Sequence, residues 1–166
     1  MVNVFKTPGS TSRNWNVDAR VGPGSAGDDV RLVQYLLVRA PEAEPYLTTP
    51  VNGGPGIGIN DVDGIWGPQT SAAMSWLEQT FNVISDGVVD PCPPGTDFFS
   101  SQINNCFYKI ILLQQLYVIN QVRGNNSGTS NDTKTTVLMT MQDDGMCPSA
   151  LVQALNNALA NSSSTS

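Results

Sequence analysis

The sequence predicts a mainly α fold, and three observations lead to that prediction. Apolar residues recur at helical spacing in several segments, helix-favouring residues fill these segments, and clusters of Gly, Pro and Asn separate them. The chain has 166 residues, of which 40% are hydrophobic and 13% charged. This length and composition fit one compact domain with an embellishment, and they argue against disorder throughout the chain.

The first helix is expected after a polar N-terminal segment. Residues 1–20 contain Gly, Ser and Thr without a clear period, so we expect an extended arm that docks in part through Trp15. The next segment, GSAGDDVRLVQYLLVRA at 24–40, has the spacing of an amphipathic helix. Its N-terminal cap is expected at Asp28 or Asp29, because a carboxylate is favoured at the positive end of the helix dipole. The apolar positions of this helix are Val30, Val33, Leu36, Leu37 and Ala40.

A loop and a second helix follow. Residues 41–60 are rich in proline and glycine, which favour turns over a continued helix, so we expect a binding loop or an insertion. The stretch DGIWGPQT at 63–70 is a glycine turn that runs directly into a helix start. The segment PQTSAAMSWLEQTF at 68–81 predicts the second helix, with Pro68 in the first turn, where its missing N–H costs nothing.

The second half of the chain repeats the turn and ends in helices. SDGVVDPCPPG at 85–95 echoes the Asp-Gly pair of the first turn, and 96–122 predicts the third and longest helix. Lys109 and a Gln pair interrupt its apolar run, so a buried helix is expected rather than a membrane span. Residues 133–141 are rich in Thr and Val, which favours a short strand. A last helix at 148–160 precedes a disordered Ser/Thr tail.

Three motifs occur in order: GSAGDDVRLVQYLL, then VDGIWGPQTSAAMSWLEQ, then SDGVVDP. Together they resemble the peptidoglycan-binding-like domain, a small three-helix module commonly attached to bacterial cell-wall hydrolases. The resemblance covers about residues 20–105. It implies a three-helix peptidoglycan-binding-like bundle, here with a long loop insertion and a C-terminal extension that contains a further helix.

Single positions carry this resemblance. The first motif matches the family at Gly24, Ser25, Gly27, Asp29, Val30, Gln34 and Leu37. The second matches at Asp63, Gly64, Gly67, Thr70 and Ala73, and the third at Asp86, Gly87, Val88 and Val89. The chain departs from the family in its long loop at 41–60, in Glu78 at the position of a helix-end glutamine, and in CPPG at 92–95.

The predicted organisation has three parts, and the cysteines do not constrain it. We expect an N-terminal arm at 1–19, a peptidoglycan-binding-like domain with an extended third helix at 20–122, and a C-terminal extension at 123–166. The three cysteines form no C-x-x-C pair, so they specify neither a zinc site nor a disulfide framework. One bridge with a spare thiol and three buried thiols are both open for Cys92, Cys106 and Cys147.

The turn at 63–70 has a physical interpretation. Gly64 allows a positive φ after Asp63, whose carboxylate can accept hydrogen bonds from nearby backbone N–H groups. Gly67 is expected to let the chain pass closely over the first helix, and the Thr70 hydroxyl to satisfy an unpaired donor. Trp66 has two interpretations, an apolar plug that pins the turn to the bundle or an exposed platform for a sugar ring or peptide.

The candidate ligand site is a groove between the first two helices. Gln34, Tyr35, Trp66 and Gln69 are the expected contacts, together with neighbours in the loop at 41–60. Gln and Tyr supply hydrogen-bonding groups for an amide- and hydroxyl-rich ligand, and Trp offers a face for apolar sugar edges. For Gln34 and Gln69 the alternative is plain helix surface.

Several function classes are excluded or disfavoured. A net charge of −6 and the lack of a basic run argue against nucleic acid as a partner. The chain has no histidine, which removes His-activated nucleophiles and His-ligated zinc. A two-carboxylate glycosidase site is open only formally, and neither Asp-Gly turn fits a calcium loop. We therefore expect no enzyme, no cofactor and no metal.

Two functions remain. In the first, the protein is a non-catalytic binder of peptidoglycan that belongs to an envelope-directed particle or secretion system. In the second, it is a structural or adaptor subunit of a phage tail, injection apparatus or other assembly, with protein subunits as partners and a homo-oligomer open. The segment MVNVFKTPGS lacks the features of a secretory signal. We therefore expect cytoplasmic synthesis and, for a wall binder, delivery by a particle or by non-classical secretion.

Overall fold

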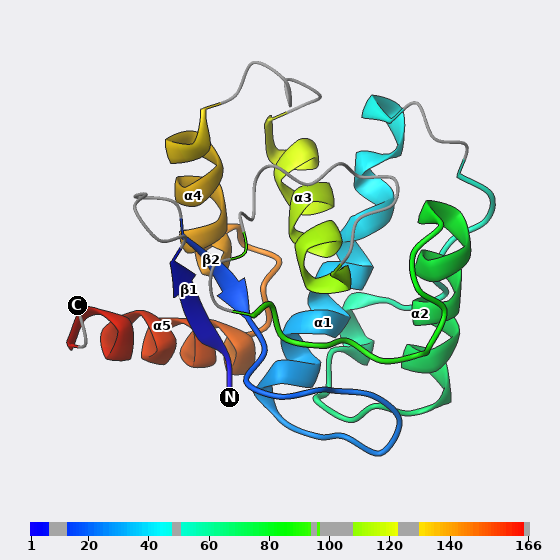
Figure 1. The fold of residues 1–166 in the computed structure, drawn as a ribbon, viewed down its shortest axis with the longest axis horizontal. Coiled ribbons are helices and arrows are strands. Elements are labelled where there is room, and N and C mark those ends of the chain that lie inside the picture. The colour runs from blue at the N-terminus through cyan, green and yellow to red at the C-terminus, as the bar shows by residue number, and fades with distance from the viewer. Residues whose placement is uncertain (7–12, 48–50, 94–95, 97–107, 123–129, 165–166) are drawn as a thin grey trace.

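The computed structural model describes residues 1–6, 13–47, 51–93, 96, 108–122 and 130–164. Within these residues it is mainly helical, as the sequence predicts, with one small antiparallel sheet (Figure 1). The α-helices are α1 (Asp28–Arg39), α2 (Pro68–Phe81), α3 (Lys109–Val122), α4 (Asn131–Met139) and α5 (Ser149–Ser164). The strands are β1 (Asn3–Lys6) and β2 (Arg13–Asn16).

Helix α1 lies at the centre and is buried on nearly all sides, where the sequence pattern indicates only one apolar face. Its N-cap is Gly27, with a φ of 119° and no side-chain cap, so the expected cap at Asp28 or Asp29 is wrong. Asp28 instead pairs with Arg31, and Asp29 accepts a hydrogen bond from the backbone N–H of Asp18. The buried residues of α1 are Asp29, Val30, Leu32, Val33, Gln34, Tyr35, Leu36, Leu37 and Arg39.

The expected N-terminal arm is a β-hairpin. Strand β1 pairs with β2 in antiparallel register. The Trp15 side chain is fully buried, and its Nε1 donates to the carbonyl oxygen of Leu138 at 2.7 Å. The other edge of β2 meets α3, where the Gln114 amide accepts from the Trp15 N–H and donates to the Trp15 carbonyl, both at 2.8 Å. The Gln114 side chain thus takes the place of a neighbouring strand.

The loop at 41–60 is more regular than its composition suggests. A 3₁₀ helix, η1 (Ala40–Tyr46), continues directly from α1 and includes Pro45, and a second, η2 (Ile59–Asp61), precedes the first turn. One proline lies at the start of η1 and Pro45 lies inside it, so proline does not end the helical path here. The expectation that the helical path ends before 41 is therefore wrong.

The expected strand at 133–141 is wrong, because this segment forms α4. Ser130 caps the helix by accepting a hydrogen bond from the Thr133 N–H at 3.2 Å. The hydroxyls of Thr136 and Thr140 donate to the carbonyls four residues earlier, at 2.9 and 2.7 Å. Capping and these internal bonds therefore override the β propensity of the Thr-rich sequence.

Helices α3 and α5 differ from their expected bounds. Helix α3 begins at Lys109, and the expected helical residues 97–107 lie outside the described residues. Helix α5 runs from Ser149 to Ser164 rather than from 148 to 160, so the first part of the expected tail is helical. Its buried residues recur at three- and four-residue spacing: Leu151, Ala154, Leu155 and Ala158.

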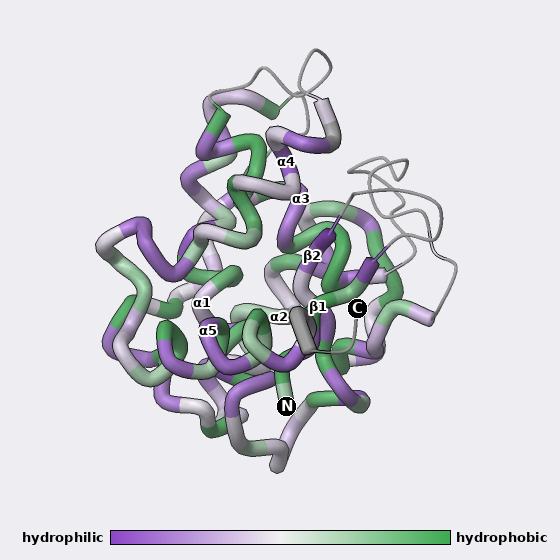
Figure 2. The backbone as a smooth tube through the Cα atoms, turned by 90° about the vertical axis from the view of Figure 1, so that its left-hand side faces the viewer, coloured by the Kyte–Doolittle hydropathy of each residue, from purple (hydrophilic) through white to green (hydrophobic). Residues whose placement is uncertain are grey.

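One hydrophobic core joins the hairpin, α1, α2, α3 and the C-terminal helices. Hydrophobic and hydrophilic residues are interleaved along most of the backbone (Figure 2), as expected for elements that turn one side to a core. Among the described residues, no helix combines the length and the apolar character that crossing a membrane requires.

Replacing Gln114 tests the hairpin attachment. We expect Gln114→Leu to lower the free energy of unfolding by about 1–3 kcal/mol, because it leaves the buried Trp15 N–H without a partner and the Trp15 C=O with only the Asn14 amide. Urea denaturation followed by circular dichroism measures this. Gln121→Leu, at an exposed position of the same helix, is the control and should change stability by less than about 0.5 kcal/mol. Equal stabilities for the two variants would contradict the proposed attachment.

Candidate functional site

The first Asp-Gly turn packs against the segment that leads into α1. The Gly27 N–H donates to the Gly64 carbonyl at 2.8 Å, and the Trp66 N–H donates to the Ser25 carbonyl at 2.9 Å. These bonds form a short antiparallel bridge. Gly64 has a φ of +79°, and a Cβ there would lie 3.0 Å from the Arg31 guanidinium carbon. The positive backbone angle therefore favours glycine, and any larger residue would also displace the Arg31 side chain.

Gln34 fixes this turn from the centre of the fold. Its Oε1 accepts from the Gly64 N–H at 2.9 Å. Its Nε2 donates to Asp63 Oδ1 at 3.1 Å and to Ile65 O and Thr70 Oγ1, both at 3.0 Å. Gln34 is fully buried, so the amide is committed to the turn and cannot serve as a ligand contact. The Thr70 hydroxyl accepts from this amide and not, as expected, from an unpaired N–H at the start of α2, where no side-chain cap is present.

The second Asp-Gly turn repeats the geometry of the first. Gly87 has a φ of +72°, and Asp86 Oδ1 accepts from the Val88 N–H at 3.2 Å, as Asp63 Oδ1 accepts from the Ile65 N–H at 3.0 Å. The Gly87 N–H donates to a buried side chain of the preceding helix, Glu78 Oε2, at 2.8 Å. Gln34 and Glu78 therefore play the same part: each accepts a hydrogen bond from the glycine N–H of one turn.

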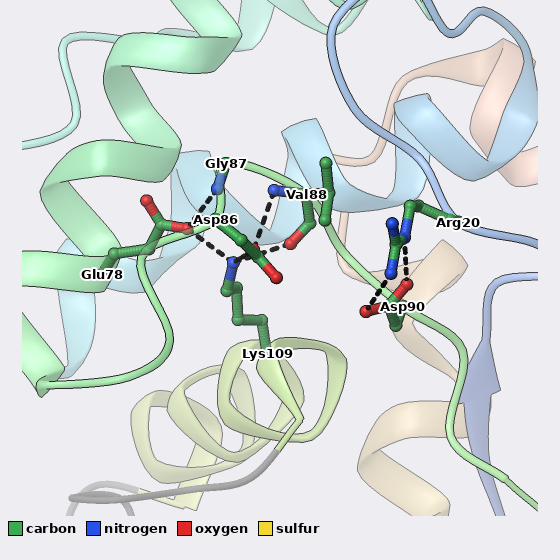
Figure 3. Close-up of polar contacts among 7 residues, drawn as sticks. All are labelled: Arg20, Glu78, Asp86, Gly87, Val88, Asp90 and Lys109. Atoms are coloured by element: carbon green, nitrogen blue, oxygen red, sulfur yellow. Dashed lines mark hydrogen bonds and ion pairs between the residues drawn. The ribbon is translucent and has the colours of Figure 1, made fainter.

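Glu78 differs from Gln34 in its charge, and Lys109 compensates that charge. Figure 3 shows the Lys109 ammonium between the turn and α2. It donates to Glu78 Oε2 at 2.5 Å, to Asp86 Oδ1, and to the Val88 carbonyl at 2.7 Å. Three donors thus meet three acceptors, which satisfies a buried ammonium. Arg20 and Asp90 form a separate, more exposed pair beside this cluster.

The carboxyl groups of both turns are held in the ionised form. The hydrogen bond from the Ile65 N–H, followed by that from Gln34, lowers the pKa of Asp63 below its usual 3.8. Burial alone would raise the pKa of Asp86, but the bonds from Lys109 and the Val88 N–H outweigh it and lower the pKa. Both carboxylates thus favour the folded state above about pH 3.8, and this contribution is lost as the pH falls through the folded-state pKa values.

Tyr35 lies in a different cluster from Gln34, so the structure does not bring the two together in a groove. The hydroxyls of Tyr35 and Tyr117 both donate to Asp144 Oδ2, which also receives Arg39 Nη1 at 2.7 Å. The Arg39 guanidinium lies over both rings, 5.8 and 5.4 Å from their centres. Burial, with the bond to Asp144, raises the pKa of Tyr35, so the phenol stays protonated. This cluster joins α1 and α3 to the turn before α5.

The other expected contacts differ in exposure. The Trp66 side chain is 3% exposed, and its Nε1 donates to Ser71 Oγ at 3.0 Å, which supports the plug interpretation and leaves no exposed ring face. Gln69 is exposed, and its Nε2 donates to the Gly56 carbonyl at 2.8 Å. The expected close approach at Gly67 is wrong, since a Cβ there meets nothing within 4 Å. Gly67 is the N-cap of α2 instead.

A hollow of about 210 Å³ lies beside the first turn. Gln34 and Thr70 are its buried residues, whereas Asp63, Ile65, Pro68 and Gln69 are exposed around it. Ile65 is 62% exposed at the tip of the turn. The hollow therefore combines carboxylate and amide oxygens with the apolar side chains of Ile65 and Pro68.

The described residues offer no metal centre. No three Cys, Asp or Glu side chains gather there at ligand distance, and the sequence has no histidine. Cys92 is buried, and Cys106 lies outside the described residues. Burial, with the charge of Asp144, raises the pKa of Cys147 to about 12, so its thiol stays protonated.

Sequence reasoning missed the cluster of Glu78, Asp86 and Lys109. One signal was present: a lone lysine in an apolar helical run must find a counter-ion if the helix is buried. The identity of that counter-ion depends on how α2 and α3 pack, which local sequence does not encode. Comparison with known proteins finds no matching family model, no matching curated protein and no matching solved structure.

Replacing Asp63 tests the first turn. Asp63→Ala removes the acceptor for the Ile65 N–H and for one hydrogen bond from Gln34, so we expect the free energy of unfolding to fall by about 1–2 kcal/mol. Thermal unfolding should show a lower Tm. Asp143→Ala is the control, because Asp143 is an exposed carboxylate at a distant position. An unchanged Tm in Asp63→Ala would refute the hydrogen-bonded account of the turn.

Replacing Lys109 tests the second turn. Lys109→Met leaves the buried Glu78 carboxylate without its cation, so we expect a loss of about 3–5 kcal/mol in urea denaturation. The double variant Lys109→Met/Glu78→Gln should recover much of this loss, since a neutral amide oxygen can still accept from the Gly87 N–H. Lys6→Met, at an exposed lysine, is the control. A double variant no more stable than Lys109→Met would show that charge pairing is not the reason.

Proposed function

We propose that the protein is a non-catalytic peptidoglycan-binding-like protein that forms part of an envelope-directed particle or secretion system. The hollow beside the first Asp-Gly turn is its ligand site. The observation that carries this proposal is that the three motifs of the resemblance bond to one another. Residues 24–27 of the first motif bond to the first turn, and Gly87 of the third motif donates to Glu78 of the second at 2.8 Å. The motif residues thus build one frame around α1 and α2.

The chemistry of the hollow fits a peptide-bearing ligand better than a bare sugar chain. Asp63 and Gln69 present oxygen atoms that can accept from amide N–H and amino groups, and Ile65 adds an apolar contact. Trp66 is excluded as a stacking platform by its burial. We therefore assign recognition to the stem peptides of the cell wall.

The alternative is a structural or adaptor subunit of a phage tail, injection apparatus or other assembly. It is favoured by the burial of Gln34, Tyr35 and Trp66, whose polar groups are all bonded within the chain. In that case the motif residues serve the fold alone, and protein subunits are the partners.

Co-sedimentation with insoluble peptidoglycan sacculi separates the two functions. We expect the wild type to sediment with sacculi and Ile65→Ser/Gln69→Ala to lose at least tenfold in apparent affinity, because both side chains are exposed at the hollow. Ile84→Ser/Gln153→Ala is the matched control, since it changes one exposed isoleucine and one exposed glutamine away from the hollow.

Each outcome of this experiment has a definite meaning. Loss in the first double variant alone supports wall binding at the hollow. Equal sedimentation of all three proteins places the binding surface elsewhere. No sedimentation of the wild type, with a defined oligomer by size-exclusion chromatography and light scattering, supports the structural subunit.

A further inference from the structure

The Lys109 amine and the Glu78 carboxyl group are in contact inside the fold. The nitrogen is 2.5 Å from Glu78 Oε2, and the two side chains are only 6% and 5% exposed. The Glu78 carboxyl carbon is bonded to that oxygen at about 1.2 Å, so it lies within about 4 Å of the nitrogen. An amine and a carboxyl carbon held this close are a nucleophile and an electrophile in position to react.

Burial brings the neutral form of this pair within reach. A protonated amine cannot attack a carbon atom, so the ammonium must first lose a proton. Keeping two charges out of water is costly, so transfer of one proton from nitrogen to oxygen costs less in a buried pair than in an exposed one. The reaction has to occur only once in each molecule, so a small population of the neutral pair is sufficient.

The second Asp-Gly turn supplies the other groups that such a reaction needs. The Gly87 N–H donates to Glu78 Oε2 at 2.8 Å, so it stabilises the negative charge that develops on this oxygen during attack. Asp86 Oδ1 contacts the Lys109 nitrogen and can take a proton from it. Figure 3 shows the amine between these two acidic side chains.

We propose that Lys109 and Glu78 form an isopeptide bond that cross-links α3 to α2. The new bond joins Lys109 Nζ to Glu78 Cδ, and the bond between Cδ and Oε1 breaks. The nitrogen loses two protons, which Asp86 passes one after the other to the leaving oxygen, and this oxygen departs as water. Asp86 ends as the carboxylate that it was at the start, so no further reactant is needed.

The product keeps the hydrogen bonds of the site and removes its two buried charges. Oε2 becomes the amide oxygen and still accepts from the Gly87 N–H. The one N–H that remains on the Lys109 nitrogen can donate to the Val88 carbonyl, which lies 2.7 Å away. Groups held in reacting geometry reach effective concentrations of about 10⁵–10⁸ M, which favours condensation over hydrolysis.

The cross-link goes beyond the proposed wall-binding function and does not depend on it. Neither Lys109 nor Glu78 lines the hollow beside the first turn. The bond closes a loop between positions 31 residues apart, so it constrains the unfolded chain as a disulfide does.

Electrospray mass spectrometry of the denatured full chain tests the bond directly, because denaturation separates an ion pair but not an amide. The reference is Lys109→Met/Glu78→Gln, which cannot form the bond and should have its sequence mass. We expect the wild type to be lighter than its sequence mass by one water molecule after about a week at neutral pH. Chymotryptic digestion should then release one branched peptide with its link at Glu78 and Lys109.

Replacing Asp86 tests the proton transfer. Asp86→Asn keeps an oxygen beside the nitrogen but cannot carry a proton, so we expect the loss of water to slow by about 100-fold or more. Asp90→Asn is the matched control, since Asp90 follows on the same segment and pairs with Arg20 instead. This variant should lose water at the wild-type rate.

Three results would overturn the proposal. One is a wild type that still has its sequence mass after the incubation, since Lys109 and Glu78 would then form an ion pair only. Another is a branched peptide linked at Asp86, which a loss of ammonia from Asp86→Asn would also reveal. The third is equal rates of water loss in Asp86→Asn and Asp90→Asn, since Asp86 would then take no part in the reaction.

Discussion

The burial of α1 on nearly every side is the constraint on which the rest of the structure depends. A helix in this position cannot leave its polar groups to solvent, so each must find a partner in the element that covers it. Asp29 bonds to the backbone before α1, Gln34 to the first turn, and Arg39 to Asp144 near the C-terminal helix. These contacts tie the two ends of the chain and the central turn to one helix.

The two Asp-Gly turns show how one local solution is adapted to two environments. In both, glycine adopts a positive φ and its N–H meets a buried side-chain oxygen from a helix. A neutral amide suffices at Gln34. At Glu78 the carboxylate needs a cation, and Lys109 of α3 supplies it. Because an uncompensated buried charge is costly, this pair fixes how α2, the second turn and α3 lie together more than it adds net stability.

The sequence predicted what depends on neighbours along the chain. The helix at 68–81, the first-turn proline and the positive φ of Gly64 all follow from local chemistry. Prediction from the sequence failed where contacts with distant residues determine the structure. Tyr35 looked available for a ligand because its partner, Asp144, lies 109 residues away. The segment at 133–141 looked like a strand because Thr and Val favour strands. The Ser130 cap and the packing of α4 override that preference.

The N-terminal hairpin also depends on partners from distant parts of the chain. Gln114 and Thr135 close one side of the hairpin with side-chain oxygens, and α5 contacts it at β1. A two-stranded hairpin is marginal by itself, so its attachment through Trp15 and Gln114 is what keeps the hairpin in a fixed position.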